Sequence, residues 1–449
     1  MMDTPICDFV NAYREKNGLR MHMPGHKGRD FLGMEEMDIT EIAGADELYH
    51  ARGIIQKSEE NASSLFGTKK TVYSAEGSSL CIRAMLYLAL MHGKMQGKRP
   101  VILAGRNAHR TLMYAAALLD IEIEWLYPEA TETLISCRIS GKGLQAALDE
   151  MPQKPVAVYV TTPDYLGNCL DIGELARVCR AYDLPLLVDN AHGAYLKFLP
   201  GDQHPITLGA SICCDSAHKT LPVLTGGAYL HIGKHAPDVF AAQAERAMAL
   251  FASTSPSYLI LQSLDRANPY LADGYRNDLA AMIGQLELMK EKLSAHGYRI
   301  IGNEPGKLTI APKSYGYTGD QLHDLLRSGG MECEFSDPDF LVMMPTPALH
   351  EAALKQTEEM LLNIPPRAAI QDAPPALPKP RKILSIRQAM LSLQKEIPTK
   401  EALGKILADA HVGCPPCIPI LAAGEEIDPA ALENFRYYGV ETCSVVAEE

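Results

Sequence analysis

The sequence predicts an α/β fold, with a large domain built on a mostly parallel sheet that helices cover on both faces. From about residue 60 onwards, apolar and β-branched runs alternate in regular order with helical stretches. Strand–helix–strand units of this kind place parallel strands in one sheet, and a ligand then binds beyond the carboxyl ends of the strands. The alternation weakens after about residue 270, which indicates a smaller α+β domain followed by a C-terminal α+β domain.

The individual elements follow from local signals along the chain. A short first helix is expected after Thr4, its cap, with Pro5 in the first turn and Gly18 at its end. A loop rich in glycine, proline and basic residues spans 21–30. The predicted strands are 100–104, 155–162, 185–189, 210–215 and 227–232, and the clearest predicted helices are 78–94, 172–183 and 275–296.

The chain is expected to divide into five segments. They are an N-terminal helix and loop arm (1–50), the large domain (51–270), the small α+β domain (271–365), a proline-rich linker (366–382) and a C-terminal domain (383–449). The linker should be semi-extended, because proline-rich segments favour extended backbone.

Composition narrows the class of protein. A chain of 449 residues with 47% hydrophobic content can bury a large core. A net charge of −13 argues against a nucleic-acid partner, and we find neither an apolar run long enough for a membrane helix nor a signal peptide. The eleven cysteines are scattered, which is typical of reduced thiols. We therefore expect a soluble cytoplasmic protein without a membrane partner.

Two features in the first half of the chain stand at the start of a predicted helix and at the end of a predicted strand. In "SAEGSS" (74–79), Gly77, Ser78 and Ser79 begin an apolar helix and offer N–H groups and hydroxyls to an anion such as phosphate. An ordinary helix cap is the alternative explanation. In "RNAH" (106–109), His109 falls at the carboxyl edge of a strand, where a satisfied core or surface histidine is the alternative.

Two further features lie at, or just after, the ends of later predicted strands. Asp189 ends a buried strand, where a carboxylate needs a cation or several donors, unless it only caps the next turn. Lys219 lies in "DSAHKT" (215–220), 30 residues after Asp189, which is about one strand–helix–strand step. A buried lysine forms Schiff bases readily, whereas a surface lysine would extend its amine into water.

Together these four features match one cofactor. A phosphate cup, a histidine facing a ring, an aspartate for a pyridinium nitrogen and a Schiff-base lysine are the parts of a pyridoxal 5'-phosphate (PLP) site. They occur in the chain order expected of a doubly wound PLP enzyme.

The chain resembles the short form of the bacterial ornithine/lysine/arginine decarboxylases, PLP enzymes of the aminotransferase-like fold (fold type I). The resemblance covers nearly the whole chain. Its stretches are "MHMPGHKG" (21–28), "DITEIAGADELY" (38–49), "RNAHRT" (106–111), "VDNAHGAY" (188–195), "DSAHKTLPVLTGGAYLH" (215–231), "ASTSPSY" (252–258) and "PPCIPILAAGEEI" (415–427).

The resemblance implies a role for each site residue. Lys219 would hold PLP, Asp189 would face the pyridinium nitrogen, and His109 would stack on the ring. Thr254 and Ser255 would reach the site of a neighbouring subunit, which implies a homodimer or a larger assembly with the active site at the interface. The remaining cofactor-binding residues would be Gly77, Ser78, Ser79, His192, Ser216 and His218.

The implied reaction is decarboxylation of lysine, ornithine or arginine to an amine and CO₂. The resemblance places the large domain (51–270) as the PLP-binding domain and 383–449 as the C-terminal decarboxylase domain. His218 and Lys219 are both candidates for returning the proton to Cα, and the sequence does not choose between them.

Some positions depart from the family pattern, namely Asn190, Tyr195, Cys414 and Cys417, together with "AEGSS" in the phosphate loop. Cys417 and Glu425 are candidates for the substrate end of the site, although a solvated surface acid is an equal explanation for Glu425. A single "CPPC" (414–417) is a weak zinc signal, so we expect a structural loop and no metal site.

Other functions use the same residues. An aminotransferase or lyase would share the PLP site, and an aminotransferase would need an arginine for the substrate carboxylate. Arg327 and Arg367 are available but stand in no recognisable motif. A non-catalytic homologue that regulates an active decarboxylase is the third hypothesis, and retention of Lys219, Asp189 and His109 argues against it.

Overall fold

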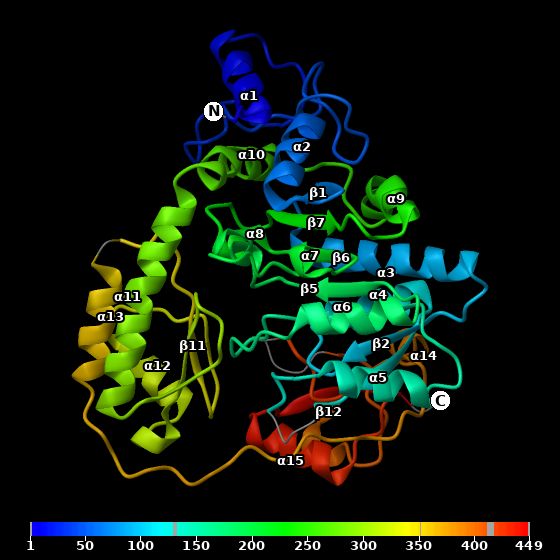
Figure 1. Cartoon of the computed structure of the whole chain (residues 1–449), viewed down its shortest axis with the longest axis vertical. Coiled ribbons are helices and arrows are strands. Elements are labelled where there is room, and N and C mark those ends of the chain that lie inside the picture. The colour runs from blue at the N-terminus through cyan, green and yellow to red at the C-terminus, as the bar shows by residue number, and fades with distance from the viewer. Residues whose placement is uncertain (1, 129–132, 351, 411–416, 448–449) are drawn as a thin grey trace. The chain divides into compact units, whose positions relative to one another are not determined.

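The computed structural model describes residues 2–128, 133–350, 352–410 and 417–447 (Figure 1). The chain folds into two compact units, each made of two separate stretches. The first unit comprises Met1–Lys98 and Leu175–Asp278, and the second comprises Arg99–Glu174 and Leu279–Glu449. The division into five consecutive segments stays a prediction.

The first unit carries the elements that hold the predicted PLP lysine. They are α1 (Pro5–Glu15), α2 (Ile54–Phe66), β1 (Lys70–Ser74), α3 (Gly77–Met95), β5 (Leu186–Asp189), η1 (Ala194–Phe198), α7 (Pro205–Leu208), β6 (Ile212–Asp215), α8 (Ala217–Thr220), β7 (Ala228–Ile232), α9 (Asp238–Ala249) and α10 (Tyr258–Ala272).

The second unit carries the other strands of the main sheet and all of the C-terminal elements. They are β2 (Val101–Gly105), α4 (Thr111–Leu119), β3 (Glu122–Leu126), α5 (Gly141–Glu150), β4 (Ala157–Thr161), β8 (Arg299–Ile301), β9 (Leu308–Ala311), η2 (Pro312–Tyr315), α12 (Gly319–Ser328), β10 (Phe335–Ser336), β11 (Leu341–Met343), α13 (Ala353–Leu362), α14 (Ile386–Met390), β12 (Gln394–Pro398), η3 (Thr399–Glu401), α15 (Pro429–Tyr437) and β13 (Thr442–Val446). Helices α6 (Ile172–Ala181) and α11 (Tyr275–His296) cross the boundaries between the units.

The main sheet confirms the predicted α/β class. Its strands follow the order β1-β7-β6-β5 in the first unit and β4-β2-β3 in the second. The pairs β5–β6, β2–β4 and β2–β3 are parallel, whereas β7 runs antiparallel to β6 and β1. Among the described residues, no helix is both long and apolar enough to span a bilayer.

All five predicted strands and the three predicted helices are present, but β1 and β3 were missed. Each stands at the end of its strand order, so it has one neighbouring strand and needs no continuous apolar run. In β3 the sequence "EIEWL" alternates glutamate with apolar residues, and only Ile123 and Leu126 are buried. Short mixed strands of this kind carry a weak signal.

The first helix begins where predicted, but its ends differ in detail. Thr4 occupies the cap position, yet its hydroxyl donates to Asp8 Oδ1 (2.9 Å) and accepts no backbone N–H of the helix. The helix ends at Glu15, because Asn17 already adopts a φ of 45°, before Gly18 is reached.

The core of the first unit lies where α3 packs against β1, β6 and β7 (Figure 1). Helix α9 also packs on α3. Because neighbours surround α3, its apolar residues occur on several sides, and Leu80, Met85 and Leu88 are all buried. The N-terminus of α3 lies beside the start of β7, where the Gly77 N–H donates to the carbonyl of Gly226 (2.7 Å).

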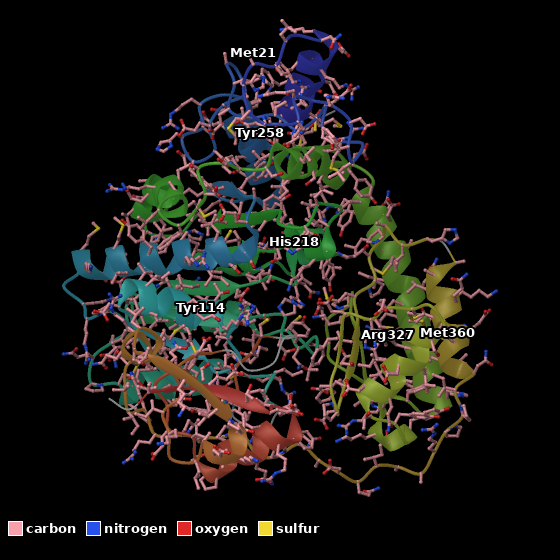
Figure 2. All side chains as sticks on the ribbon, turned by 180° about the vertical axis from the view of Figure 1, so that it is seen from behind. Met21, Tyr114, His218, Tyr258, Arg327 and Met360 are labelled. Atoms are coloured by element: carbon pink, nitrogen blue, oxygen red, sulfur yellow. The ribbon has the colours of Figure 1, made fainter. Side chains whose placement is uncertain are left out.

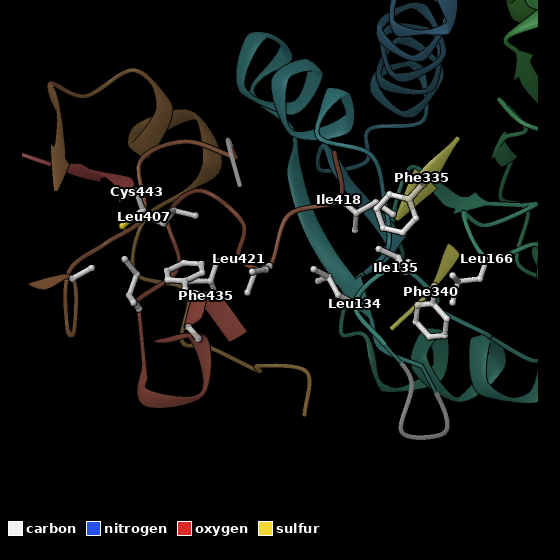
Figure 3. Packing of buried hydrophobic residues seen from close by; sticks show 14 of the residues in the cluster. Leu134, Ile135, Leu166, Phe335, Phe340, Leu407, Ile418, Leu421, Phe435 and Cys443 are labelled. Atoms are coloured by element: carbon white, nitrogen blue, oxygen red, sulfur yellow. The ribbon is translucent and has the colours of Figure 1, made fainter. Parts of the chain in front are cut away.

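The second unit contains a separate core around the C-terminal segment. The antiparallel sheet β10-β11-β9-β8 and the pair β12–β13 both contribute to it. Figure 3 shows Ile418 beside Phe335 and Ile135, and it shows Phe435 near Leu407 and Leu421. The segment after the proline-rich stretch is therefore packed within this unit.

Glu59 of α2 gives a first testable consequence of burial. It is almost inaccessible to water, and its Oε1 accepts the Tyr73 backbone N–H (2.9 Å). Burial raises the pKa of Glu59 to about 8. The folded protein then holds a proton that the unfolded chain releases above its ordinary pKa of about 4.5, so stability falls as pH rises from about 4.5 to 8.

We expect Glu59→Gln to abolish this pH-dependent fall in the free energy of unfolding. The fall amounts to at most about 1.4 kcal/mol for each pH unit between about 4.5 and 8. The variant should match the wild type near pH 5 and exceed it in stability at pH 8. Urea unfolding at pH 5, 6.5 and 8 measures the difference, with the exposed Glu60→Gln as the control. Parallel curves for wild type and Glu59→Gln would show that Glu59 is ionised in the folded protein.

Candidate functional site

Two parallel strands of the first unit end side by side at the candidate site. β5 ends at Asp189, which is paired in register with Cys214 of β6. The Asp189 side chain is buried, and its Oδ1 accepts hydrogen bonds from the Ala191 N–H (3.2 Å) and the Cys214 thiol (3.6 Å). Burial raises the pKa of Cys214 well above its usual value, so the thiol stays protonated and can donate.

Lys219 lies on the single turn of helix, α8, that follows β6 directly. Its Nζ lies 2.8 Å from Nε2 of His192, which stands in the loop after β5. His192 is buried, and Lys219 is half-buried. The structure thus brings together the "VDNAHG" and "DSAHKT" stretches, which are separated in sequence but follow neighbouring strands.

His218 is held by the backbone on the same turn. Its Nδ1 donates to the carbonyl of Gly227 (2.9 Å), and its own N–H donates to the same oxygen (3.1 Å). Figure 2 shows His218 on this turn of the first unit. In a neutral ring this contact leaves Nε2 as the acceptor, so the backbone determines which ring nitrogen can exchange a proton.

The start of α3 provides an anion cradle. Ser216, which follows β6, donates its hydroxyl to Ser78 Oγ (2.8 Å) at the first turn of α3. Gly77 adopts a φ of +71°, and a Cβ added there would meet no atom within 4 Å. A phosphate group could bind here, because two hydroxyls and the positive end of a 19-residue helix attract an anion. The open space above Gly77 leaves room for it.

These residues of the first unit fit PLP. The buried carboxylate ends β5, the lysine amine follows the adjacent β6, and Ser216 and Ser78 form the phosphate cradle between β6 and the start of α3; each matches one part of the cofactor. Ser79, the third residue of the predicted phosphate loop, lies in the same first turn of α3. In the part of the chain that the structure describes, the predicted set Gly77, Ser78, Ser216, Lys219 and His192 is therefore assembled locally.

His109 belongs to the second unit, between β2 and α4. Its Nδ1 accepts the N–H of Thr111 (3.2 Å) and lies 2.9 Å from the Thr111 hydroxyl. The ring is therefore fixed by the first turn of α4, which orients one edge of the imidazole.

Thr254 and Ser255 lie in the exposed loop between α9 and α10. Ser255 donates its N–H to Ser253 Oγ (3.1 Å), and Ser253 donates its N–H to Glu76 Oε1 (2.8 Å). Because Glu76 precedes the cradle at Gly77, this loop is tied to the N-terminus of α3. Both hydroxyl residues remain accessible on the surface of the chain.

Glu425, in the second unit, is buried, so the explanation of a solvated surface acid is wrong. Its Oε2 accepts the N–H of Ala422 (2.6 Å) and lies 3.4 Å from Nη2 of Arg106. Burial raises the pKa of Glu425, and the nearby Arg106 opposes that rise.

Arg106 is a residue that sequence reasoning passed over. It follows β2, is almost wholly buried, and donates to the carbonyls of Pro419 (3.2 Å) and Ile420 (2.9 Å). A buried arginine directly after a strand was the available signal, within the same "RNAH" stretch that pointed to His109. It binds the C-terminal segment to the end of β2.

Cys417 begins the last described segment, with a φ of +60°, and its carbonyl accepts the N–H of Arg110 (2.9 Å). Its backbone thus contacts the turn that carries His109. Cys414 lies outside the described residues.

We expect Glu425→Gln to lower the free energy of unfolding by about 1–3 kcal/mol, because it removes the carboxylate from a buried arginine. Thermal unfolding of the purified protein measures this, with the exposed Glu433→Gln as control. If stability were unchanged while KM for a basic amino acid rose more than tenfold, Glu425 would instead bind the substrate.

Comparison with known proteins identifies the family of the chain. A family model described as "Orn/Lys/Arg decarboxylase, major domain" matches residues 4–304, about two thirds of the chain. The chain is 29% identical over 469 residues to an arginine decarboxylase of Bacillus anthracis, covering 97% of this chain and 92% of the relative. It is 28% identical over 466 residues to the uncharacterized protein YaaO of Bacillus subtilis (strain 168), covering 96% and 94%.

Among solved structures, the constitutive lysine decarboxylase of Escherichia coli superposes with a TM-score of 0.79. That superposition covers 99% of this chain and 82% of the other, at 17% sequence identity. The structural likeness, which extends to other PLP enzymes, confirms the aminotransferase-like fold. The family match and the full-length relatives show that the chain belongs to the Orn/Lys/Arg decarboxylase family and is an amino-acid decarboxylase.

Proposed function

We propose that the chain catalyses the PLP-dependent decarboxylation of a basic L-amino acid, namely lysine, ornithine or arginine, to the corresponding amine and CO₂. The observation that carries the proposal is the placement of the Lys219 amine, 2.8 Å from His192, on the turn between buried Asp189 and the Ser78–Ser216 cradle. The names of the relatives, which include arginine and lysine decarboxylases, support a basic substrate.

Each residue has a defined task in this proposal. Lys219 holds the cofactor through its amine, and the hydroxyls of Ser78 and Ser216 bind the phosphate. Bound PLP supplies the electron sink for the carbon–carbon bond cleavage. Asp189 keeps a proton on the ring nitrogen, because a buried carboxylate stabilises the adjacent positive charge. His109 stacks on the ring, and Gly77, Ser79 and His218 complete the cofactor site.

The proton that returns to Cα comes from Lys219 or His218 in this proposal. His192 lies within hydrogen-bond distance of Lys219 Nζ and can exchange a proton with it. His218 keeps Nδ1 on the Gly227 carbonyl, so its exchangeable site is Nε2.

We also propose that the protein acts as a homodimer or larger assembly, with Thr254 and Ser255 reaching the partner's active site. The N-terminal arm exposes a run of large apolar side chains, which is typical of an interface. Met21 is 91% exposed and projects outward from the arm (Figure 2), and Leu19, Phe31 and Leu32 are also exposed. Ten described cysteines are free thiols, which supports a reducing, cytoplasmic location.

The test is a substrate panel with purified PLP-loaded protein. Lysine, ornithine, arginine and neutral amino acids are each supplied, and amine products are quantified to obtain kcat/KM. We expect one basic amino acid to exceed every neutral one by at least about a hundredfold. Conversion of the substrate into its 2-oxo acid, with an added 2-oxo acid converted into an amino acid and no CO₂ released, would indicate transamination. A protein that took up no PLP would indicate a regulatory homologue.

A further inference from the structure

A buried polar cluster connects the two strand ends that carry the candidate site. It consists of Asn190, His204, Asp215 and His231, and the side chains of all four are inaccessible to water. Asn190 directly follows Asp189 of β5. Asp215 is the last residue of β6 and directly precedes Ser216.

The Asp215 carboxylate accepts hydrogen bonds on both of its oxygens. Its Oδ1 accepts the side-chain amide of Asn190 (2.7 Å), and its Oδ2 accepts Nε2–H of His204 (2.9 Å). Nε2 of His231 lies 3.3 Å from the same Oδ2. The backbone N–H of Asn190 also donates to the carbonyl of Cys214 (3.0 Å), so both donors of Asn190 bind the end of β6.

The cluster resembles a metal site in composition, since the ligand atoms of His204, Asp215 and His231 lie within 4.8 Å of one another. The tautomer of His204 argues against a metal. The N–H of Ile206 donates to Nδ1 of His204 (3.3 Å), so Nδ1 carries no proton and a neutral ring must carry it on Nε2. A protonated Nε2 donates to Asp215 and has no lone pair for a cation.

The charges of the cluster agree with a hydrogen-bonded carboxylate. Burial opposes ionisation of Asp215, but the two histidines and their hydrogen bonds outweigh it and hold the pKa below its usual value. Burial lowers the pKa of His231, which favours a neutral ring. Asp215 is therefore an ionised acceptor at the centre of the cluster.

We propose that Asp215, through Asn190, is a positioning residue that sets the distance between the Asp189 carboxylate and the Ser216–Lys219 turn. This inference rests on the proposed function, because it concerns the same PLP site. Asn190 and Asp215 are the direct sequence neighbours of Asp189 and Ser216, so a change in their hydrogen bond would move the Asp189 carboxylate relative to the Ser216–Lys219 turn. Neither residue touches the cofactor in this account.

The test exchanges the two side chains. Asn190→Asp places two carboxylates against each other in a dry site, and Asp215→Asn leaves two amides facing each other, with the one at position 215 also facing His204. The double variant Asn190→Asp/Asp215→Asn restores one carboxylate and one amide in the opposite order. We expect each single variant to lower kcat about tenfold or more with a smaller change in KM. The pH titration of the visible band of lysine-bound PLP should shift in each.

The double variant should recover kcat to within about threefold of wild type and return the spectral titration toward the wild-type curve. Asn190→Ala removes the amide without adding charge, so it tests the loss of the Asn190–Asp215 hydrogen bond if one of the other single variants does not fold. Glu59→Gln, a buried acid in α2 that lies outside the site, is the matched control and should leave kcat and the spectrum unchanged.

Equal kcat and spectra in wild type, Asn190→Ala and the double variant would overturn the proposal while leaving the proposed function intact. A folded double variant no better than the worse single variant would overturn it too. A wild-type protein that binds no PLP would overturn both. One tightly bound metal ion per chain, detected by elemental analysis and lost in Asp215→Asn, would replace the positioning role with a metal site.

Discussion

Replacing Lys219 with alanine is expected to abolish amine formation from every basic amino acid and to remove the visible absorption of lysine-bound PLP. The loss of kcat should exceed about a thousandfold, because no other amine can take over covalent attachment of the cofactor at this turn. Lys219 is the residue whose Nζ lies beside His192, at the end of β6. Steady-state kinetics and an absorption spectrum of the PLP-treated variant measure both effects.

The control is Lys70→Ala, which removes a lysine on β1 of the same unit that pairs with Glu245 (2.6 Å) of α9. It should retain the spectrum and nearly all of the activity. A Lys219→Ala protein that stayed coloured and released CO₂ would show that another lysine holds the cofactor.

Replacing Asp189 with asparagine is expected to lower kcat by about a hundredfold or more while PLP remains attached to Lys219. An amide has no negative charge, so it cannot stabilise the proton on the ring nitrogen, although it preserves size and the contact with the Ala191 N–H. The measurement is kcat under saturating PLP, with the amount of bound cofactor determined by its absorbance.

Asp238→Asn provides the comparison, since Asp238 is an exposed acid whose partner is the surface residue Lys69. It should not change kcat. If Asp189→Asn retained kcat within twofold of wild type, the protonated ring nitrogen would depend on another group.

The central strands and their end residues were predictable because they are buried on both faces. β5 and β6 are apolar runs up to their last residue, so a polar residue at their ends, such as Asp189, stands out. The search for apolar runs failed for β1 and β3, which stand at the ends of the strand order, where polar residues are tolerated. The residue types along a strand therefore decided which parts of the sheet could be recognised, since β1 is buried over residues 71–74 but its sequence "KTVYS" mixes polar and apolar residues.

The site itself was only partly predictable, because its hydrogen bonds join residues distant in sequence. No local pattern reveals that Arg106 pairs with Glu425, 319 positions later, or that Asp215 accepts from His204. The contact of Lys219 with His192 follows from the pairing of β5 with β6, which the strand order alone makes visible. The types of residue at the site were therefore recognisable in the sequence, whereas their hydrogen-bond partners could be identified only in the folded structure.

The most direct test of the central claim follows the substrate carboxyl carbon. Wild-type protein loaded with PLP is incubated with lysine, ornithine and arginine that carry isotope only in the carboxyl group, and the label is traced. We expect the label to leave entirely as CO₂, in equal amount to the amine formed, for at least one of the three. Label retained in a 2-oxo acid, or no CO₂ from any of the three, would contradict the assignment of a basic amino-acid decarboxylase.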